Sequence, residues 1–259
     1  MEQITLEYQP LPFLKYTRKI KGAFPQTLEE LNQKQLIAIS SLVNQKISET
    51  NFLHIMTGIR KFRINKLDNY QRYKLMQLFE PFTEIQPFDR FIIPVINTGT
   101  GSFVSPKPKL AQMTFAQFIF IESYFEDYQN KKQQDLLLKF IASLYTPVAE
   151  SFNENNVQAN ASRIKLANPQ VLDAIVINYV FIKEWLALAY PLVFGVPETE
   201  NEPQKNKPLR NNNSNSAWLK IFENIVGDDL INQNRYAIIP LHNVLRWMTN
   251  KIKENMKRK

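Results

Sequence analysis

The sequence predicts a mainly α-helical fold, a helical bundle-like domain with a small extended or β element formed by the N-terminus and residues about 90–104. Three observations predict it. Apolar residues recur at spacings of three and four along most of the chain, which is the period of an amphipathic helix. Helix-capping pairs precede several of these stretches, and alternation of apolar and polar residues is found at the start. With 44% hydrophobic and 12% aromatic residues, the chain of 259 residues can build a substantial core.

The extended element is predicted from three stretches. In residues 4–8, ITLEY, apolar and polar residues alternate as in a strand with one buried face, and residues 14–20 nearly repeat the pattern. Residues 90–96, RFIIPVI, form a third apolar run that leads into the turn-forming sequence NTGTGS. Because Pro94 has no amide hydrogen to donate, it places this run at a sheet edge or at a bulge.

The helices are predicted from caps and apolar stripes. A Ser, Thr, Asp or Asn followed three residues later by Glu or Gln is the capping-box pattern that opens a helix. The pairs with this spacing are Thr27/Glu30, Asn32/Gln35, Asp68/Gln71 and Thr114/Gln117. Apolar stripes follow in Leu36, Ile39, Val43 and Ile47, and then in Phe52, Ile55, Met56 and Ile59. We therefore expect consecutive short helices between residues 27 and 79.

Residues 113–130, MTFAQFIFIESYFEDYQN, hold six aromatic rings and three carboxylates. A membrane stripe, a metal-binding carboxylate helix and the core of a helical domain are the three interpretations to compare. Four apolar side chains share one stripe at helical spacing, and two further rings widen it; these are Phe118, Ile121, Phe125 and Tyr128, with Phe115 and Phe120. A stripe of this width is typical of an inner helix of a bundle, so we expect it to be buried.

Glu122 and Glu126 lie one helical turn apart, as metal-binding carboxylates do in di-metal bundles. Such bundles also need Glu-x-x-His pairs on other helices, and neither His54 nor His242 has a glutamate three residues before it. We therefore expect no metal and an acidic face in contact with solvent. A nearby lysine is expected to offset the repulsion between the two carboxylates.

The most apolar stretch, residues 168–196, opens with Asn168 as a cap and Pro169 at the first helical position. A membrane span needs about 20 apolar residues, and a charge at its centre costs roughly 2.5–3.5 kcal/mol. Lys183 and Glu184 lie near the middle of this stretch. We therefore expect a central buried helix and no membrane partner.

The chain divides into three predicted parts. Residues 1–196 are expected to form the main helical domain with its N-terminal extended element. Residues 197–216 are polar, contain proline and are rich in asparagine, which predicts a flexible linker. Residues 217–259 are expected to form a C-terminal helical unit that packs on the main domain.

The sequence offers no catalytic motif, and we expect a protein that is not an enzyme and that uses no cofactor. It has no cysteine, which excludes disulfides, thiolate zinc sites and cysteine nucleophiles. Residues 98–103, TGTGSF, lack the spacing of a phosphate-binding loop, so we expect a tight hairpin there. His54 and His242 belong to no catalytic pattern and are interpreted as structural or surface histidines.

Positive charge supplies the best candidate binding residues. The net charge of +8 and the pI of about 9.4 suit an anionic partner. The last helix, expected from about Pro240 to the end, has an apolar face and a basic face. The candidate anion-binding or partner-binding residues are Lys107, Lys109, Arg246, Lys253, Lys257, Arg258 and Lys259. A basic helix end can contact nucleic acid or an acidic protein, but cations there also complement the helix dipole.

Four segments resemble a family of uncharacterised proteins from phages and prophages of Bacteroides-like bacteria. They are residues 24–43, residues 110–147 with their apolar-aromatic helix and acidic turn, residues 180–195, and WLKIFENIVGDD with the helix after it. The resemblance implies a tail-module or virion protein, a tail-assembly chaperone-like factor or a minor structural component. It implies other tail or virion proteins as partners, a place in the bacterial host cytoplasm or the virion, and no catalytic residues. The alternative is an accessory protein that binds nucleic acid through its basic C-terminal helix.

Overall fold

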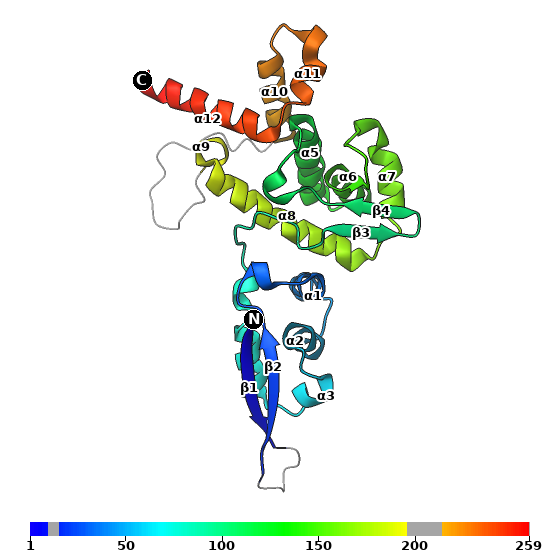
Figure 1. Cartoon of the computed structure of the whole chain (residues 1–259), viewed down its shortest axis with the longest axis vertical. Coiled ribbons are helices and arrows are strands. Elements are labelled where there is room, and N and C mark those ends of the chain that lie inside the picture. The colour runs from blue at the N-terminus through cyan, green and yellow to red at the C-terminus, as the bar shows by residue number, and fades with distance from the viewer. Residues whose placement is uncertain (10–15, 196–213, 259) are drawn as a thin grey trace.

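The computed structural model describes residues 1–9, 16–195 and 214–258 of the chain. Its outline is elongated, with two lobes stacked end to end (Figure 1). The N-terminal lobe contains a β-hairpin and short helices, and the C-terminal lobe is built around one long central helix. Helices dominate both lobes, and two small antiparallel sheets complete the described residues. The predicted mainly α-helical fold with a small β element is confirmed.

The N-terminal lobe opens with an antiparallel hairpin of β1 (Glu2–Tyr8) and β2 (Arg18–Phe24). The strand expected at residues 4–8 is therefore confirmed. The second strand starts and ends later than the alternation in residues 14–20 indicates. In the hairpin register Tyr8 pairs with Arg18 and Glu2 pairs with Phe24, so β2 must continue to Phe24 to pair with all of β1. Residues 10–15 lie outside the described residues.

A glycine lets this hairpin lie directly against α2 (Glu49–Thr57). A Cβ atom at Gly22 would lie 2.8 Å from Ile59 Cγ1 and 3.0 Å from the carbonyl oxygen of Thr57. Both distances are shorter than an ordinary van der Waals contact. The close approach encloses the fully buried Ile20 of β2 between the hairpin and the helices.

The remaining helices of this lobe are α1 (Gln33–Val43), α3 (Lys61–Ile64) and α4 (Asn69–Gln77), with 3₁₀ turns at Leu28–Glu30 and Glu80–Thr83. Asn32 and Asp68 start α1 and α4 with both hydrogen bonds of the predicted capping box. The box predicted at Thr27 is wrong, since Thr27 makes no cap hydrogen bond. Leu31 becomes extended after a single 3₁₀ turn, so the α-helix starts only beyond Asn32.

The C-terminal lobe contains the elements β3 (Val95–Thr98), β4 (Gly101–Val104), α5 (Phe115–Lys131), α6 (Gln134–Leu144), β5 (Thr146–Pro147), α7 (Val157–Ile164), α8 (Pro169–Ala189), α9 (Pro191–Phe194), α10 (Ser214–Val226), α11 (Gln233–Ala237) and α12 (Leu241–Lys257). Three-residue 3₁₀ turns lie at Pro108–Leu110, Glu154–Asn156 and Leu230–Asn232. The sheet has the order β3-β4-β5, so the strand after Pro94 is an edge strand, as expected. Gly99 and Thr100 form the turn of the hairpin that residues 98–103 predict.

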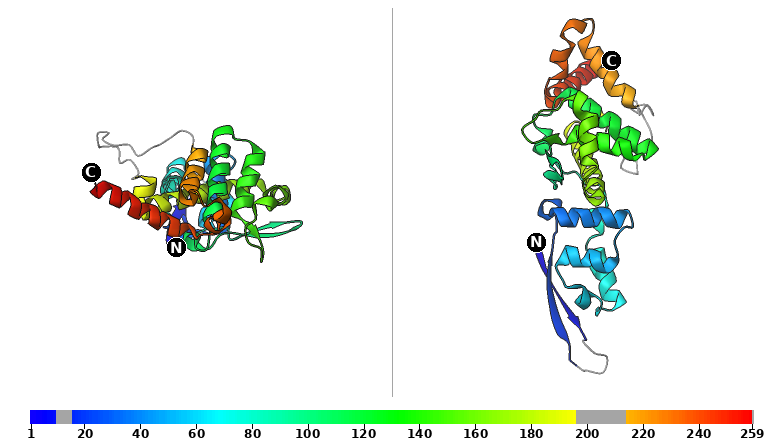
Figure 2. Two further views of the ribbon diagram at one scale, coloured as in Figure 1. Left: turned by 90° about the horizontal axis from the view of Figure 1, so that it is seen from above. Right: turned by 90° about the vertical axis from the view of Figure 1, so that its right-hand side faces the viewer.

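The two lobes meet where α1 packs against α8 (Figures 1 and 2). Leu36 and Ile39 of α1 and Ile175 of α8 are fully or almost fully buried. At the edge of this contact, Lys46 Nζ lies 2.5 Å from Asp173 Oδ2. The junction therefore combines a small apolar contact with one ion pair.

The aromatic stripe of α5 forms part of the core. Phe115, Phe118 and Ile121 are at most 1% exposed, and Phe125 packs against Tyr179 of α8 with ring centroids 5.1 Å apart. Thr114 caps the helix by accepting a hydrogen bond from the backbone of Gln117. This confirms the interpretation of residues 113–130 as a buried inner helix.

The acidic face expected on this helix is wrong for Glu122. Its side chain is only 3% exposed and accepts hydrogen bonds from the Tyr179 hydroxyl at 2.6 Å and from Lys183 Nζ at 2.7 Å. Because Tyr179 and Lys183 lie four residues apart on α8, both face the same carboxylate. The expected lysine is therefore present, inside a helix–helix contact.

The most apolar stretch forms α8, with Asn168 and Pro169 at its start as predicted. Ile175, Ile182 and Leu186 on this helix are fully buried. Within the described ranges, no helix has the length and apolar character that a membrane crossing requires. A central buried helix is therefore confirmed.

The predicted linker lies outside the described residues up to position 213, and residues 214–216 already belong to α10. This helix packs on α5, where the ring of Trp218 lies 5.0 Å from that of Phe118 and 6.3 Å from that of Phe115. The C-terminal helices therefore share the aromatic core of the lobe.

Candidate functional site

The first turn of α12 is fixed to the C-terminal lobe by backbone hydrogen bonds. The amide of Phe115 donates to Ile239 O at 2.8 Å, and the amide of Leu241 donates to Met113 O at 2.9 Å. These bonds join the residues before α12 to the residues before α5. Leu241 and Leu245 are then fully buried in the lobe, so the base of α12 has a defined direction.

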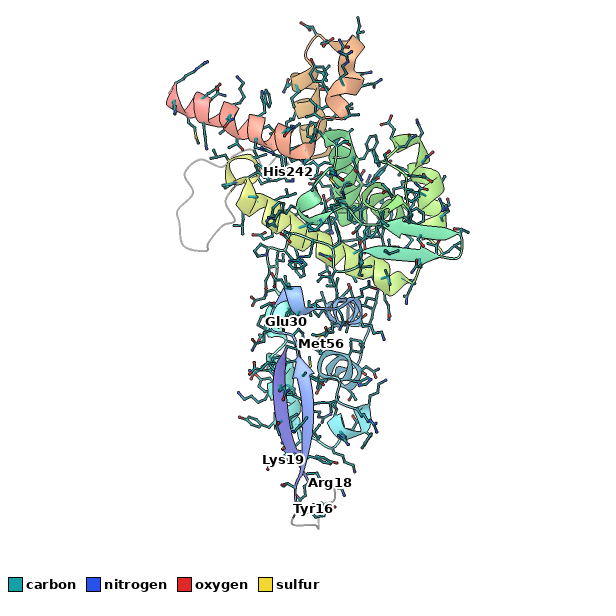
Figure 3. The ribbon with its side chains drawn as sticks, in the orientation of Figure 1. Tyr16, Arg18, Lys19, Glu30, Met56 and His242 are labelled. Atoms are coloured by element: carbon teal, nitrogen blue, oxygen red, sulfur yellow. The ribbon has the colours of Figure 1, made fainter. Side chains whose placement is uncertain are left out.

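His242 holds the same base from the other side. Its Nε2 lies 2.6 Å from the carbonyl oxygen of Lys109, and its Nδ1 lies 2.8 Å from the Tyr190 hydroxyl (Figure 3 labels the histidine). Since a carbonyl oxygen only accepts, Nε2 carries the hydrogen and Nδ1 of a neutral ring accepts from Tyr190. His242 thus connects α12, the loop around Lys109 and the end of α8, which is a structural role.

An apolar stripe on α12 continues past the edge of the lobe. Leu241 and Leu245 are 0% exposed, Met248 and Ile252 are partly exposed, and Met256 is 64% exposed. These positions follow one another at spacings of three and four and so share one face of the helix. Figure 1 shows the second half of α12 leaving the body. Trp247, beside this stripe, is 45% exposed.

Exposed cations lie along α12, with Arg246 in its packed first half and the others in its free second half. Arg246, Lys253, Lys257 and Arg258 are exposed, and none of them forms an ion pair with a carboxylate of the described residues. Lys251 pairs with Glu254 at 3.2 Å. The remaining predicted residue of this group, Lys259, lies outside the described residues.

The predicted binding residues do not gather at one place. Lys109 lies at the base of α12 through its contact with His242, and Lys107 lies nearby in the same loop. At 1.5 Å per residue, the helix places Lys257 about 22 Å from His242 along its axis. The loop cations and the helix-tip cations therefore belong to separate surfaces.

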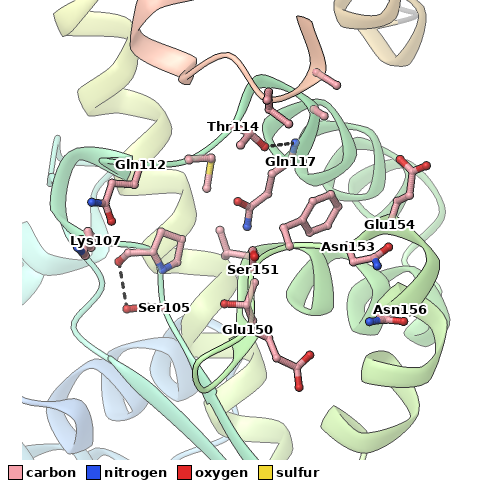
Figure 4. A pocket seen from close by; sticks show the side chains of 18 of the residues that line it. Ser105, Lys107, Gln112, Thr114, Gln117, Glu150, Ser151, Asn153, Glu154 and Asn156 are labelled. Atoms are coloured by element: carbon pink, nitrogen blue, oxygen red, sulfur yellow. Dashed lines mark hydrogen bonds between the residues drawn. The ribbon is translucent and has the colours of Figure 1, made fainter. Parts of the chain in front are cut away.

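An open cleft of 1020 Å³ lies beside the base of α12 (Figure 4). Three segments line it: residues 105–117, residues 144–156 and the α11 region at 234–238. Most polar groups of the lining are carboxamides and hydroxyls, in Gln112, Gln117, Asn153, Asn155, Asn156, Asn234, Ser105, Thr114, Thr146 and Ser151. The lining also holds Lys107, Glu150 and Glu154, and it contains no imidazole or thiol.

The loops around the cleft have an unusual backbone. Lys109, Leu110 and Gln112 in one loop and Ala149 in the other have φ values between 54° and 70°, the left-handed region that residues with a Cβ rarely adopt. Such positions cost of order 1–3 kcal/mol each and persist where the surrounding structure enforces them. The carboxamides and hydroxyls of the cleft can both donate and accept hydrogen bonds. Such groups suit a polar ligand, for example a polypeptide main chain.

Sequence reasoning missed two residues of the α12 surface. Met256 lies on the apolar face, four residues after Ile252, and is not among the predicted binding residues. Trp247 is not among them either, because its exposure depends on where the body of the protein ends. Among the described residues, no group of three or more His, Asp or Glu side chains could hold a metal ion.

Comparison of the chain with protein-family models, with curated proteins and with solved structures gives no match.

Proposed function

We propose that the protein is a non-enzymatic component of a phage or prophage tail-assembly module, a chaperone-like factor or a minor structural protein, which binds a protein partner through α12. The observation that carries the proposal is the apolar stripe, whose exposure rises from 0% at Leu245 to 64% at Met256. The partners would be other tail or virion proteins, in the host cytoplasm or in the virion. Both the partner class and the location rest on the family resemblance.

The free half of the stripe has the pattern of a helix that lies in an apolar groove. In that mode of recognition, side chains at i, i+3 or i+4, and i+7 or i+8 anchor the helix. Met248, Ile252 and Met256 have this spacing. Full burial of such a side chain contributes about 1.5–3 kcal/mol. With Trp247, the exposed half of α12 therefore carries enough apolar surface for a specific contact.

The cations beside the stripe predict an acidic rim on the partner. Complementary charge raises the association rate and fixes register. The helix dipole is felt only within the last turn of a helix, so it accounts for Lys257 and Arg258. It does not account for Arg246 and Lys253, which lie further from the C-terminus and have no carboxylate partner among the described residues. Those two cations favour a binding surface.

The experiment is co-expression with each neighbouring gene product of the tail module, followed by co-purification. Met256→Glu places a charge in the stripe, and Asn250→Glu makes the same change in charge on the other face of the same helix. Both positions are exposed, so both variants should fold like the parent protein. We expect Met256→Glu to abolish co-purification and Asn250→Glu to retain it.

Two results would count against this function. Retention of the partner by both variants would show that the stripe is not the contact. Nucleic-acid binding that falls steeply with salt and is lost on truncation after Asn250, with no protein partner recovered, would favour the accessory nucleic-acid protein instead. At about 150 mM salt we expect α12 to bind DNA weakly or not at all.

A further inference from the structure

A second surface lies on the N-terminal lobe, away from α12. Residues 58–74, GIRKFRINKLDNYQRYK, contain six cations and one carboxylate, although the whole chain carries only +8. They comprise residues 58–60, all of α3, the four residues after it and the first six residues of α4. This short stretch therefore holds much of the excess positive charge of the protein.

Exposed aromatic rings are concentrated in the same lobe. In the described ranges, five aromatic side chains are exposed, and four of them are Tyr16 at 45%, Phe62 at 56%, Tyr70 at 68% and Tyr73 at 59%; the fifth is Trp247. Rings of this size are normally buried because exposure costs hydrophobic free energy. Four exposed rings in one small lobe therefore indicate a contact surface.

Each of three rings has a cation at its face. Arg63 Cζ lies 5.7 Å from the centre of the Phe62 ring, and Lys74 Nζ lies 5.7 Å from that of Tyr70. On the hairpin, Arg18 Cζ lies 5.7 Å from the centre of the Tyr16 ring. In all three pairs the cation therefore lies at the same distance from the ring that it covers.

The cations of residues 58–74 are not neutralised by carboxylates of the described ranges. Arg60, Lys61, Arg63, Lys66, Arg72 and Lys74 form no ion pair with any acidic group of the described residues. Elsewhere in the molecule, several exposed lysines do find such partners, as in the pairs of Lys131 with Asp127 and Lys19 with Glu7. The charge of this surface is therefore available to an anion.

The surface is held in place by buried anchors. Ile64, Leu67 and Leu75 are at most 4% exposed and lie between the exposed residues in the sequence. Gln71 Nε2 donates to the carbonyl oxygen of Glu7 at 2.7 Å, which fixes the start of α4 against the hairpin. Figure 3 shows Tyr16, with the neighbouring cations of β2, at the free end of that hairpin.

On α4 the exposed groups share one face. Tyr70, Tyr73, Lys74 and Gln77 follow at spacings of three and four, and the Gln77 amide donates to the Tyr73 hydroxyl at 2.9 Å. Two rings and one cation therefore lie in a row along a helix that is fixed at its first turn. No reorganisation of the backbone is needed to present them.

We propose that this surface, formed by residues 60–74 with Tyr16 and Arg18 and named here the distal surface, binds single-stranded nucleic acid. Unpaired bases stack on aromatic rings, and cations beside the rings contact the phosphates that connect the bases. An acidic peptide would use the cations and leave the rings without a matching group. In a duplex the bases are already stacked on one another, so exposed rings gain little from it.

The test is fluorescence anisotropy of the full-length protein with labelled 20-nucleotide single strands of RNA and DNA and with a duplex of the same length. We expect both single strands to bind more tightly than the duplex. The logarithm of the binding constant should fall with the logarithm of salt concentration, with a slope of about −0.7 for each phosphate contacted. The RNA and DNA arms then show which strand is preferred.

Matched variants separate stacking from charge. Tyr70→Ala and Tyr73→Ala should each weaken single-strand binding about 5- to 150-fold, since base–aromatic stacking contributes about 1–3 kcal/mol per base. Tyr70→Phe keeps the ring and should bind like the parent protein. Lys74→Ala should reduce the salt slope by about 0.7. Lys253→Ala on α12 should change neither quantity.

Three results would overturn the proposal. They are equal binding of duplex and single strand, no binding of any strand at about 50 mM salt, and unchanged binding in both tyrosine-to-alanine variants. If the protein instead binds vesicles of anionic lipid or an acidic peptide and no nucleic acid, the distal surface has a different partner class. Circular dichroism of each variant confirms that the exposed substitutions leave the fold intact.

Discussion

The contact between α5 and α8 predicts a strong energetic coupling between Glu122 and Lys183. The Glu122 carboxylate is 3% exposed and has two partners, the Tyr179 hydroxyl and Lys183 Nζ. Lys183→Met removes the only cation and leaves a buried charge, a change that typically costs 3–5 kcal/mol. We expect the lower part of that range, about 3 kcal/mol, because the Tyr179 hydrogen bond remains.

Glu122→Gln keeps an acceptor for the Tyr179 hydroxyl and removes the charge. The Lys183 side chain is 31% exposed, so its ammonium can turn toward solvent once the carboxylate is gone. We therefore expect a smaller cost for Glu122→Gln, about 1–3 kcal/mol. In the double variant no charge is left buried, so its cost should be well below the sum of the two single costs.

Urea unfolding followed by far-UV circular dichroism measures all four proteins of this double-mutant cycle. The expected coupling energy between Glu122 and Lys183 is about 1.5–3 kcal/mol, the upper range for residues in contact. A coupling energy below about 0.5 kcal/mol would refute the reasoning, because additive costs mean that the two groups do not interact in the folded protein.

Three further predictions concern single groups. Burial raises the pKa of the Tyr145 hydroxyl well above its usual value of about 10, so the unfolded chain loses this proton first. The contribution of Tyr145 to the free energy of unfolding should therefore be fully present below about pH 10 and be lost above it, so the fall in stability between pH 8 and 11, measured by urea unfolding, should be smaller in Tyr145→Phe. Gly22→Ala should cost about 1–3 kcal/mol through its clash with the Ile59 side chain and the Thr57 carbonyl oxygen, whereas Gly99→Ala, which meets nothing within 4 Å, should melt like the parent protein. Asn32→Ala should lower the free energy of unfolding by about 1 kcal/mol through loss of its cap, and Thr27→Ala, which breaks no cap bond, by a few tenths at most.

The sequence predicts the features of this fold that depend on neighbouring residues. The caps at Asn32, Asp68 and Asn168 form because the side chain and its target amide are only two or three residues apart. The stripe of α5 is visible because its apolar positions repeat on one helix face. Thr27 shows the limit of such patterns, since one extended residue at Leu31 is enough to separate a capping pair from the helix.

Features that depend on distant residues could not be predicted in this way. The partners of Glu122 lie 57 and 61 residues further along the chain, and only the packing of α8 on α5 brings them together. The exposure of Met256 depends on where the C-terminal lobe ends. For the distal surface, the interleaved cations and rings of residues 58–74 are visible in the sequence, but the exposure of Tyr70 and Tyr73 requires the fold.

The most direct test of the proposed function is hydrogen–deuterium exchange of α12 in the free protein and in the complex with its co-purified tail-module partner. In the free protein, the amides of residues 241–246 should exchange slowly and those of residues 250–257 rapidly, because only the first half of the helix packs on the lobe. Binding of the partner should slow exchange in residues 250–257 and leave the distal surface unchanged. Unchanged rapid exchange in residues 250–257 of a stable complex would contradict the claim that the apolar stripe of α12 is the binding surface.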